Sequence, residues 1–212
     1  TSDSNVSDNN AIAADEGPTS VSNDSDSNTI GVKMKVLVGV PTTLTKGWQW
    51  VTLWGKLDID THFSDNAVNE IRSQKALMIN DSNYGYFGEL YDNGLEPLVA
   101  YKINATKDIL VEEAKIQWGG SYLEESKTQS LLKSWTWIPY PYYHEFSPSQ
   151  MEFGAQSGDR IVSKDDGFVE YDDEKGWEGT LESLKPWQSY LYYNTGSTRS
   201  FNWQPEAELP TG

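Results

Sequence analysis

Hydrophobic and polar residues alternate in short runs along the chain, beginning with the run from Val32 to Val38. A period of two residues is typical of a strand with one buried face, so a strand is predicted over residues 31–40. Pro41 then begins a turn, and the next run contains Trp48 and Trp50, which share one strand face because they are two positions apart. Short helical turns are predicted only at residues 65–71 and 148–153.

A tandem duplication organises these runs. Four segments recur in the same order between 87 and 91 positions later: 44–51 as 131–138, 71–74 as 161–164, 85–90 as 176–181, and 95–101 as 184–190. A duplicated chain forms the same elements twice. Each copy is therefore predicted to contain a Trp-x-Trp strand, two short strands around a Gly-aromatic-x-Gly turn, and a Tyr-rich strand after Leu-x-Pro.

The predicted fold class is mainly β with short helices, in two tandem similar β-rich units of sandwich or barrel type, preceded by an extended acidic tail. The tail covers residues 1–30, the first unit residues 31–120 with the leading strand 31–40, and the second unit residues 121–212. Side chains at matched positions are expected to lie inside: Trp48, Trp50, Leu90, Tyr101, Trp135, Trp137, Leu181 and Tyr190.

The tail has a composition unlike the rest of the chain, with six acidic residues, no Lys or Arg, and many Ser, Asn and Thr. Such a segment buries too little apolar surface to offset its ordering entropy, so it is predicted to be disordered on its own. Its one apolar island consists of Ala11, Ile12, Ala13 and Ala14. At this island the tail is small enough to lie along a sheet edge or in a groove of a neighbouring copy, so we call it the assembly tail. The alternative is a linker folded back on its own domain.

The chain is strongly acidic, since 32 Asp and Glu against 16 Lys and Arg give a formal net charge of −16. This balance argues against nucleic acid as a partner and disfavours docking on anionic lipid. The absence of Cys excludes disulfides, thiolate metal sites and Cys nucleophiles. The longest apolar stretches are strand-sized, so no transmembrane segment is predicted. We expect any secretion signal to have been removed or never to have been part of this chain.

Four short motifs follow one another in a fixed order along the chain: Gly-Trp-x-Trp, Ile-x-Ser-Gln, Gly-Trp-x-Gly-x-Leu and Leu-x-Pro-x-x-x-Tyr. The second copy matches this order of motifs better, through Gly167-Phe168, 176–179 and 184–186. Over residues 31–204 this order resembles a repeat of large secreted bacterial surface proteins, as found in Bacteroidetes. Both copies depart where that repeat has Pro-Gly-x-Gly-Tyr, because residues 97–101 and 186–190 lack the two glycines. A re-formed tight turn is expected there. The resemblance implies an exported, non-catalytic protein and offers no catalytic residues to carry over.

Candidate chemistry is sparse. The sequence has no Gly-x-Ser-x-Gly, phosphate-binding Gly loop or dinucleotide fingerprint, so we expect no enzyme and no cofactor. Asp165, Asp166, Asp172 and Asp173 flank two aromatic residues in the second copy. A glycosidase carboxylate pair and a weak Ca²⁺ site are the functional interpretations of these residues. Hairpin turns rich in Asp are the favoured one.

The aromatic residues suggest a further ligand, because flat rings stack on sugars. Repeated Trp residues are assigned to the core, so the glycan candidates are non-repeated aromatics: Trp54, Tyr84, Trp118, Tyr142, Tyr143 and Trp187. Four residues begin the Asn-x-Ser/Thr acceptor pattern for glycosylation: Asn5, Asn23, Asn80 and Asn104.

Together these observations favour a non-catalytic exported structural or adhesive subunit at the cell surface, which self-associates through its tail and sheet edges. A head-to-tail contact that does not close on itself propagates, so a filament or surface-layer component is expected. The net charge opposes association, and assembly should strengthen as ionic strength or divalent cation rises. The alternative is an extracellular carbohydrate-binding module that uses exposed Trp and Tyr.

Overall fold

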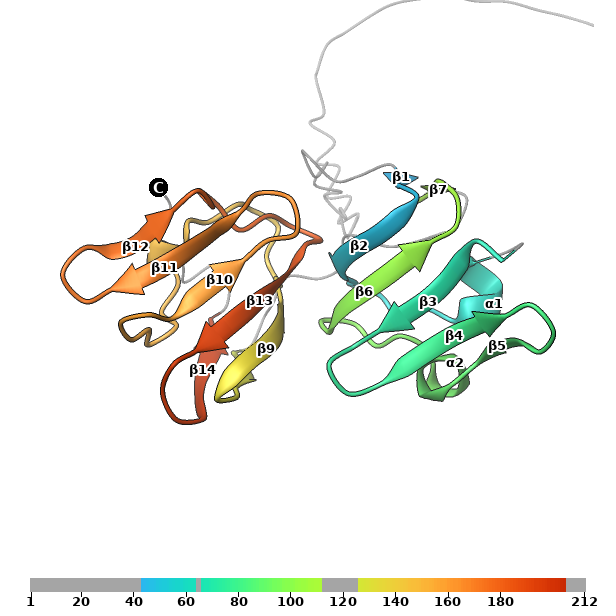
Figure 1. Cartoon of the computed structure of the whole chain (residues 1–212), viewed down its shortest axis with the longest axis horizontal. Helices are drawn as coiled ribbons and strands as arrows, with labels where there is room; N and C mark the ends of the chain where they lie inside the picture. Colours follow the sequence, from blue (N-terminus) through green and yellow to red (C-terminus); the bar gives the residue numbers. More distant parts are fainter. Residues whose placement is uncertain (1–42, 64–65, 112–125, 205–212) are drawn as a thin grey trace, which may run out of the picture. The chain divides into compact units, whose positions relative to one another are not determined.

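The computed structural model describes residues 43–63, 66–111 and 126–204, all within the compact unit formed by residues 36–212 (Figure 1). The predicted tail, the leading strand over 31–40 and the boundary at residue 120 lie outside the described residues. In the part that is described, the chain is mainly β with short helices, which confirms the predicted fold class.

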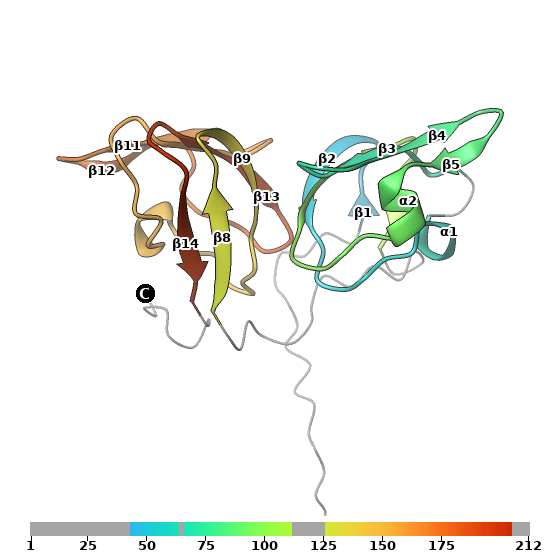
Figure 2. The same cartoon turned by 90° about the horizontal axis from the view of Figure 1, so that it is seen from below.

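The first repeat forms a five-stranded antiparallel sheet. Its elements are β1 (Thr43–Leu44), β2 (Gly47–Thr52), α1 (Ile59–His62), β3 (Val68–Arg72), β4 (Leu77–Asp81), β5 (Gly85–Phe87), α2 (Glu89–Asn93), β6 (Ala100–Ala105) and β7 (Ile109–Leu110). The sheet has the order β2-β6-β3-β4-β5, and β1 pairs separately with β7. Helices α1 and α2 cover one face of the sheet, so its other face is open (Figure 2).

The second repeat builds the same sheet again. Its elements are β8 (Lys127–Leu131), β9 (Ser134–Pro139), the 3-10 helix η1 (Pro148–Gln150), β10 (Arg160–Val162), β11 (Phe168–Asp172), β12 (Gly176–Gly179), β13 (Ser189–Asn194) and β14 (Arg199–Trp203). The order β9-β13-β10-β11-β12 repeats that of the first sheet strand for strand, and β8 pairs with β14 as β1 does with β7. The structure thus shows two tandem similar units, as the internal repeat predicts.

The β4–β5 and β11–β12 hairpins are built by the same residue types. The Oδ1 atoms of Asp81 and Asp172 each accept hydrogen bonds from the backbone N–H groups two and three residues later, at 2.8–3.1 Å. An Asp that bonds its own following backbone fixes a turn. Gly85 and Gly176 then adopt φ values of 75° and 80°, a region that favours Gly.

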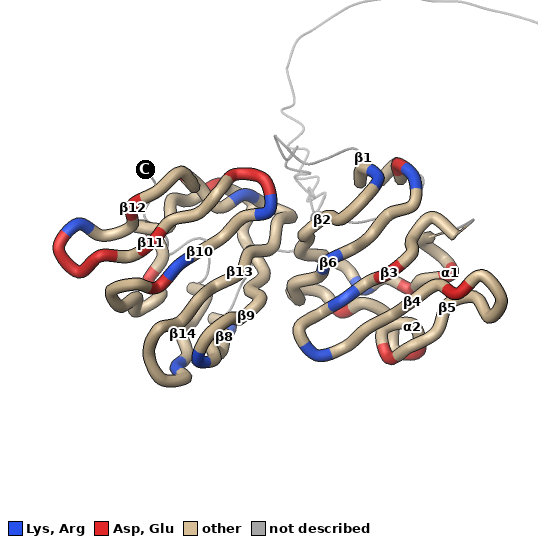
Figure 3. Tube along the Cα trace, viewed as in Figure 1, with Lys and Arg blue, Asp and Glu red and all other residues tan. Residues whose placement is uncertain are grey.

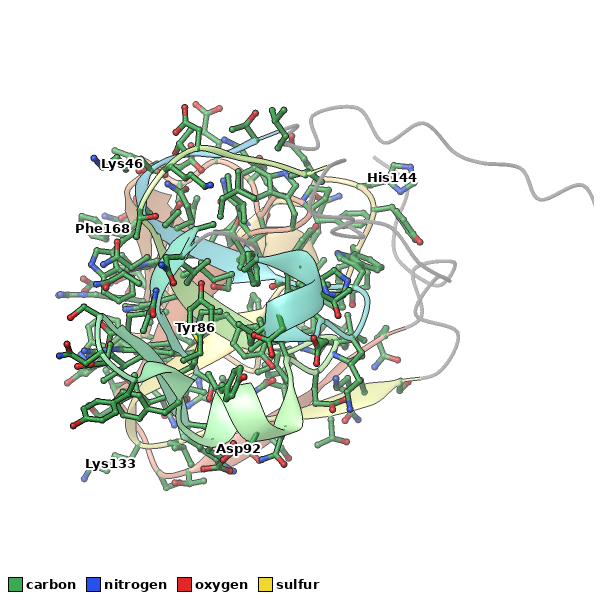
Figure 4. The ribbon with its side chains drawn as sticks, turned by 90° about the vertical axis from the view of Figure 1, so that its right-hand side faces the viewer. Lys46, Tyr86, Asp92, Lys133, His144 and Phe168 are labelled. Carbon is green, nitrogen blue, oxygen red and sulfur yellow. The ribbon has the colours of Figure 1, made fainter. Side chains whose placement is uncertain are left out.

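Each repeat has its own core on the covered side of its sheet. Leu90, Tyr101, Leu181 and Tyr190 are buried there, as predicted. Both Tyr hydroxyls accept a hydrogen bond from the backbone N–H five positions earlier, at 2.8 and 2.6 Å. Burial raises the pKa of Tyr101 to about 12 and also raises the pKa of Tyr190. The hydroxyls therefore stay protonated, and the Leu-x-Pro segment stays attached to the core. Figure 4 looks onto the β4–β5 end of the first repeat, where Tyr86 lies near α1 and α2.

The prediction that both Trp-x-Trp pairs lie in the core is wrong. The four side chains are those of Trp48, Trp50, Trp135 and Trp137. The first member of each pair is 37% or 42% exposed, and the second is half-buried on the same open sheet face. The opposite faces of the two strands are the buried ones, through Val51 in β2 and Ile138 in β9. Alternation correctly places both Trp side chains of a pair on one sheet face. It does not say which of the two faces is covered by the helices and by the strands that lie outside the sheet.

The Leu-x-Pro turn forms without glycine. The residues after Pro97 and Pro186 are Leu98 and Trp187, with φ values of 56° and 63°. Proline followed by a residue of positive φ is the pattern of a type II turn. A non-Gly residue at that position costs of order 1–3 kcal/mol, so the surrounding packing holds both turns in place.

Candidate binding surface

The open face of the first sheet carries two rows of side chains, which the strand register defines. One row consists of Trp48, Asn104, Glu70, Ile79 and Phe87. The other row consists of Trp50, Lys102, Arg72 and Leu77. An aromatic pair therefore stands at one edge of the sheet, directly beside charged and amide side chains.

The open face of the second sheet repeats this arrangement. One row consists of Trp135, Tyr193, Arg160, Glu170 and Glu178. The other row consists of Trp137, Leu191, Val162 and Phe168. Both sheets thus combine an aromatic pair with side chains that hydrogen-bond.

Lys102 joins the two open faces. Its Nζ lies 4.2 Å from the centroid of the Trp50 ring and 4.3 Å from that of the Trp137 ring. A cation over an indole is attracted by the electron-rich ring face, and this ammonium has one such ring on each of two sides. Burial, and then the nearby charge of Arg72, lowers the pKa of Lys102.

Because Trp50 belongs to the first repeat and Trp137 to the second, the two aromatic pairs form one surface. We call it the Trp face and define it as Trp48, Trp50, Lys102, Trp135 and Trp137. Figure 3 shows basic residues along β6 and β3 of the first sheet and on β10 of the second, while acidic residues gather at the tip of the β11–β12 hairpin.

The outer Trp of each pair is held by a neighbour on the same face. The Arg72 guanidinium carbon lies 5.8 Å from the Trp48 ring centroid, and Arg72 itself forms an ion pair with Glu70. Trp135 packs against Tyr193 with ring centroids 4.9 Å apart and the ring planes tilted by 52°. These contacts restrict the rings while more than a third of each outer Trp stays exposed.

Side chains also close the two sheet edges that meet. Gln74 donates from Nε2 to a backbone carbonyl of β9 at 3.0 Å, and its Oε1 accepts from a β9 N–H at 2.9 Å. The amide thus pairs with β9 as the peptide group of an added strand would. The buried Thr52 hydroxyl donates to the Gln188 carbonyl at 2.8 Å and accepts from the Tyr140 N–H at 2.9 Å. Strands β2 and β9, which carry the Trp residues, are therefore fixed.

The aromatics predicted as glycan contacts are largely engaged in packing. Tyr142 is 1% exposed, so burial excludes its ring from surface contact and that prediction is wrong. Trp54 and Tyr143 are half-buried and pack on each other with centroids 4.6 Å apart. Trp187 packs against the core of the first repeat. The structure does not bring these residues and the Trp face together in one site.

The remaining predicted residues are dispersed. Tyr84 is 86% exposed at the tip of the β4–β5 hairpin. Asn80 donates to the Asn66 side chain at 3.1 Å, and Asn104 stands beside Trp48 on the open face. Several further residues lie outside the described part of the chain: Asn5, Ala11, Ile12, Ala13, Ala14, Asn23 and Trp118.

The predicted carboxylates have separate structural roles. Asp172 caps its hairpin as Asp81 does, so this carboxylate is shared by the two copies. Asp165 is an exposed residue in an ion pair with its neighbour Lys164. Burial alone would raise the pKa of Asp166, but a hydrogen bond and the charge of Lys185, 2.8 Å away, outweigh it and lower that pKa. A glycosidase general acid needs the opposite shift.

Asp166 also lines a polar cavity of about 280 Å³, together with Glu145, Glu182 and Lys185. Among the residues that the structure describes, no three His, Asp or Glu side chains gather closely enough to hold a metal ion. Calcium at Asp165, Asp166, Asp172 and Asp173 stays a prediction.

Comparison with protein families, with curated proteins and with solved structures finds no match for this chain. The resemblance to bacterial surface repeats therefore stays a prediction that the motifs alone support. In the described part of the chain, no helix has both the length and the apolar character needed to cross a membrane.

Alternation within β2 or β9 alone does not show that the Trp side chains lie on the open face, but the neighbouring strand does. In β6, Tyr101 and Ile103 alternate with Lys102 and Asn104, which marks the face with Lys102 as the open one. Pairing β6 with β2 then transfers that assignment to the Trp residues opposite. The signal lay in the second strand of the pair.

Proposed function

We propose that this protein is a non-catalytic, exported adhesive module that binds polysaccharide through the Trp face. The observation that carries the proposal is the presence of two pairs of Trp side chains on open sheet faces. Without a ligand, water contacts the exposed parts of these rings. Contiguous exposed apolar surface rimmed by polar groups is typical of a binding site. Indole rings offer a flat apolar contact for the C–H faces of a sugar ring.

Polar side chains beside the outer Trp residues suit the hydroxyls of such a ligand. Asn104 and Glu70 follow Trp48 in its row, and Tyr193 and Arg160 follow Trp135. An amide, a phenol and charged groups supply both donors and acceptors. Because the rings are already restrained, little side-chain freedom is lost on binding, which favours affinity.

The same geometry supports a non-catalytic role. Asp172 is occupied as a hairpin cap, and Asp166 is held in an ion pair with a lowered pKa. The lowered pKa of Asp166 is the opposite of what the general acid of glycoside hydrolysis requires.

Affinity electrophoresis tests the proposal, with gels that contain neutral or acidic polysaccharides. We expect at least one polymer to retard the protein, and we expect Trp48→Ala and Trp135→Ala each to weaken retardation roughly tenfold, equivalent to about 1.4 kcal/mol. Tyr84→Ala is the matched control, because Tyr84 is an exposed aromatic away from the Trp face. A uniform absence of retardation across glucans, mannans, xylans, pectins and alginate would contradict the proposal.

Self-association through the N-terminal tail is a second candidate. It is favoured by the outer strands β5 and β12, each of which ends its sheet with no further strand among the described residues. An edge of this kind accepts an extended segment through backbone hydrogen bonds. Binding at the Trp face and assembly at these edges use different surfaces, so the two candidates can be tested separately.

A further inference from the structure

We propose that the Trp face selects polysaccharides that carry anionic groups and that Lys102 binds the anion. This inference rests on the proposed function and names its ligand class: a polymer of sugar rings bearing carboxylate or sulfate. The outer Trp residues would take the rings, and Lys102 would take the charge between them.

The charge balance of the open faces singles out Lys102. Strand register places three basic side chains there, of Arg72, Lys102 and Arg160. Arg72 pairs with Glu70, and Arg160 pairs with Glu170 at 2.7 Å. For Lys102, no carboxylate among the described residues lies within ion-pair distance. Among the described basic side chains of the two open faces, Lys102 therefore carries the one positive charge that no carboxylate neutralises.

The position of the ammonium suits a ligand that crosses the surface. Lys102 stands directly opposite Trp50, and its Nζ occupies one side of that ring and of the Trp137 ring. Sugar rings are thereby directed to Trp48 and Trp135. Successive residues on one strand face lie about 7 Å apart. A ring stacked on Trp48 can thus direct a substituent towards Lys102.

Partial burial strengthens this contact. The Lys102 ammonium has lost part of its hydration between the two indoles, which agrees with its lowered pKa. It still carries three N–H donors. An anion that arrives there meets a less screened charge than at a free surface lysine, and it returns hydrogen-bond acceptors to a group that burial has partly desolvated.

The negative charge of the whole chain allows a preference for anionic polysaccharides to be attributed to a local cation. With a net charge of −16, the protein has no general attraction for an acidic polymer. Repulsion between the two is screened beyond about 8 Å at 0.15 M salt. A preference for an acidic over a neutral polymer must therefore come from a local cation, and not from non-specific electrostatics.

Two matched polymer pairs test the inference by affinity electrophoresis at about 0.15 M NaCl. The first pair is polygalacturonate and its fully methyl-esterified form, which differ in the carboxylate charge; the second is dextran sulfate and dextran. We expect the full-length protein to prefer the anionic member of at least one pair roughly tenfold. Lys102→Met should remove that preference, so that the variant binds the charged and the neutral member of each pair equally. Lys102→Arg should retain the preference.

Lys175→Met is the control for charge alone, because Lys175 is an exposed residue in the β11–β12 hairpin that pairs with Glu178. It should leave the preference intact. Equal affinity for the charged and neutral members of both pairs would overturn the inference while the proposed function stands. A preference that survives Lys102→Met would also overturn it. Absence of binding to every polysaccharide would remove the proposed function itself.

Discussion

Asp159 provides the sharpest test of the second repeat's core. Its side chain has no exposed surface, although it carries a charge. Its Oδ1 accepts from the N–H and hydroxyl of Thr195, both at 2.8 Å, and its Oδ2 accepts from the Gln156 N–H at 3.0 Å and the Tyr192 hydroxyl at 2.8 Å. The Arg199 guanidinium completes the set as an ion pair. Every acceptor position of the carboxylate is therefore used.

The Asp159→Asn substitution keeps the size of the side chain but removes its charge and turns one acceptor into a donor. Breaking a buried ion pair from one side typically costs about 3–5 kcal/mol, because the partner is left uncompensated. In a protein of this size, 1 kcal/mol corresponds to about 2–4 °C in Tm. We therefore expect calorimetry at pH 7 to show a Tm lower by about 6–20 °C.

The pH dependence gives an independent readout. Burial works to raise the pKa of Asp159, but the hydrogen bonds from Thr195, Gln156 and Tyr192 outweigh it, so the folded pKa lies below the usual value. Its stabilisation is present above the unfolded pKa of about 3.9 and is lost as the pH falls through the lower folded pKa. The gap in Tm between wild type and variant should hold from pH 5 to neutral and narrow below about pH 4.

Asp165→Asn is the matched control, since its carboxylate is 63% exposed and its pair with Lys164 is a surface one. Such pairs contribute about 0–1 kcal/mol, so its Tm should stay within a few degrees of wild type. A Tm for Asp159→Asn as close to wild type as that of the control would refute the reasoning about the buried network.

Two further predictions follow, one for the contact between the two repeats and one for the N-terminal tail. Thr52→Val should lower the free energy of unfolding by about 1–3 kcal/mol in denaturant titrations, because the Tyr140 N–H and Gln188 carbonyl lose their buried partner; an unchanged midpoint would show that water replaces the hydroxyl. Deleting residues 1–30 should leave thermal unfolding of the two repeats unchanged and abolish any self-association seen by sedimentation velocity as ionic strength rises; equal association of the truncated chain would dispose of the tail as the assembly element.

The duplication was visible in the sequence because the residues that fix local geometry recur. Tyr101 and Tyr190 make the same hydrogen bond, and Asp81 and Asp172 cap the same hairpin. Such contacts depend on residues a few positions apart, so spacing alone reveals them. Two similar units followed directly from that regularity.

What the sequence could not provide was the set of contacts between distant residues. Lys102 meets Trp137 only because one repeat packs against the other, and Asp159 meets Arg199 across 40 positions. In the first repeat, Ile103 stands where Tyr192 contributes to the Asp159 network. The two copies thus share a backbone plan while they differ in buried chemistry, and comparison of the copies alone conceals such differences.

The central claim, that ligand binds at the Trp face, is tested most directly by NMR of the indole N–H groups. The nine Trp residues give one such resonance each, and single substitutions assign them. Oligosaccharides of whichever polysaccharide retards the protein are titrated in, and we expect the largest shifts at Trp48 and Trp135, with smaller shifts at Trp50 and Trp137. Shifts confined to Trp54 and Trp187, with the Trp face unchanged, would contradict the account.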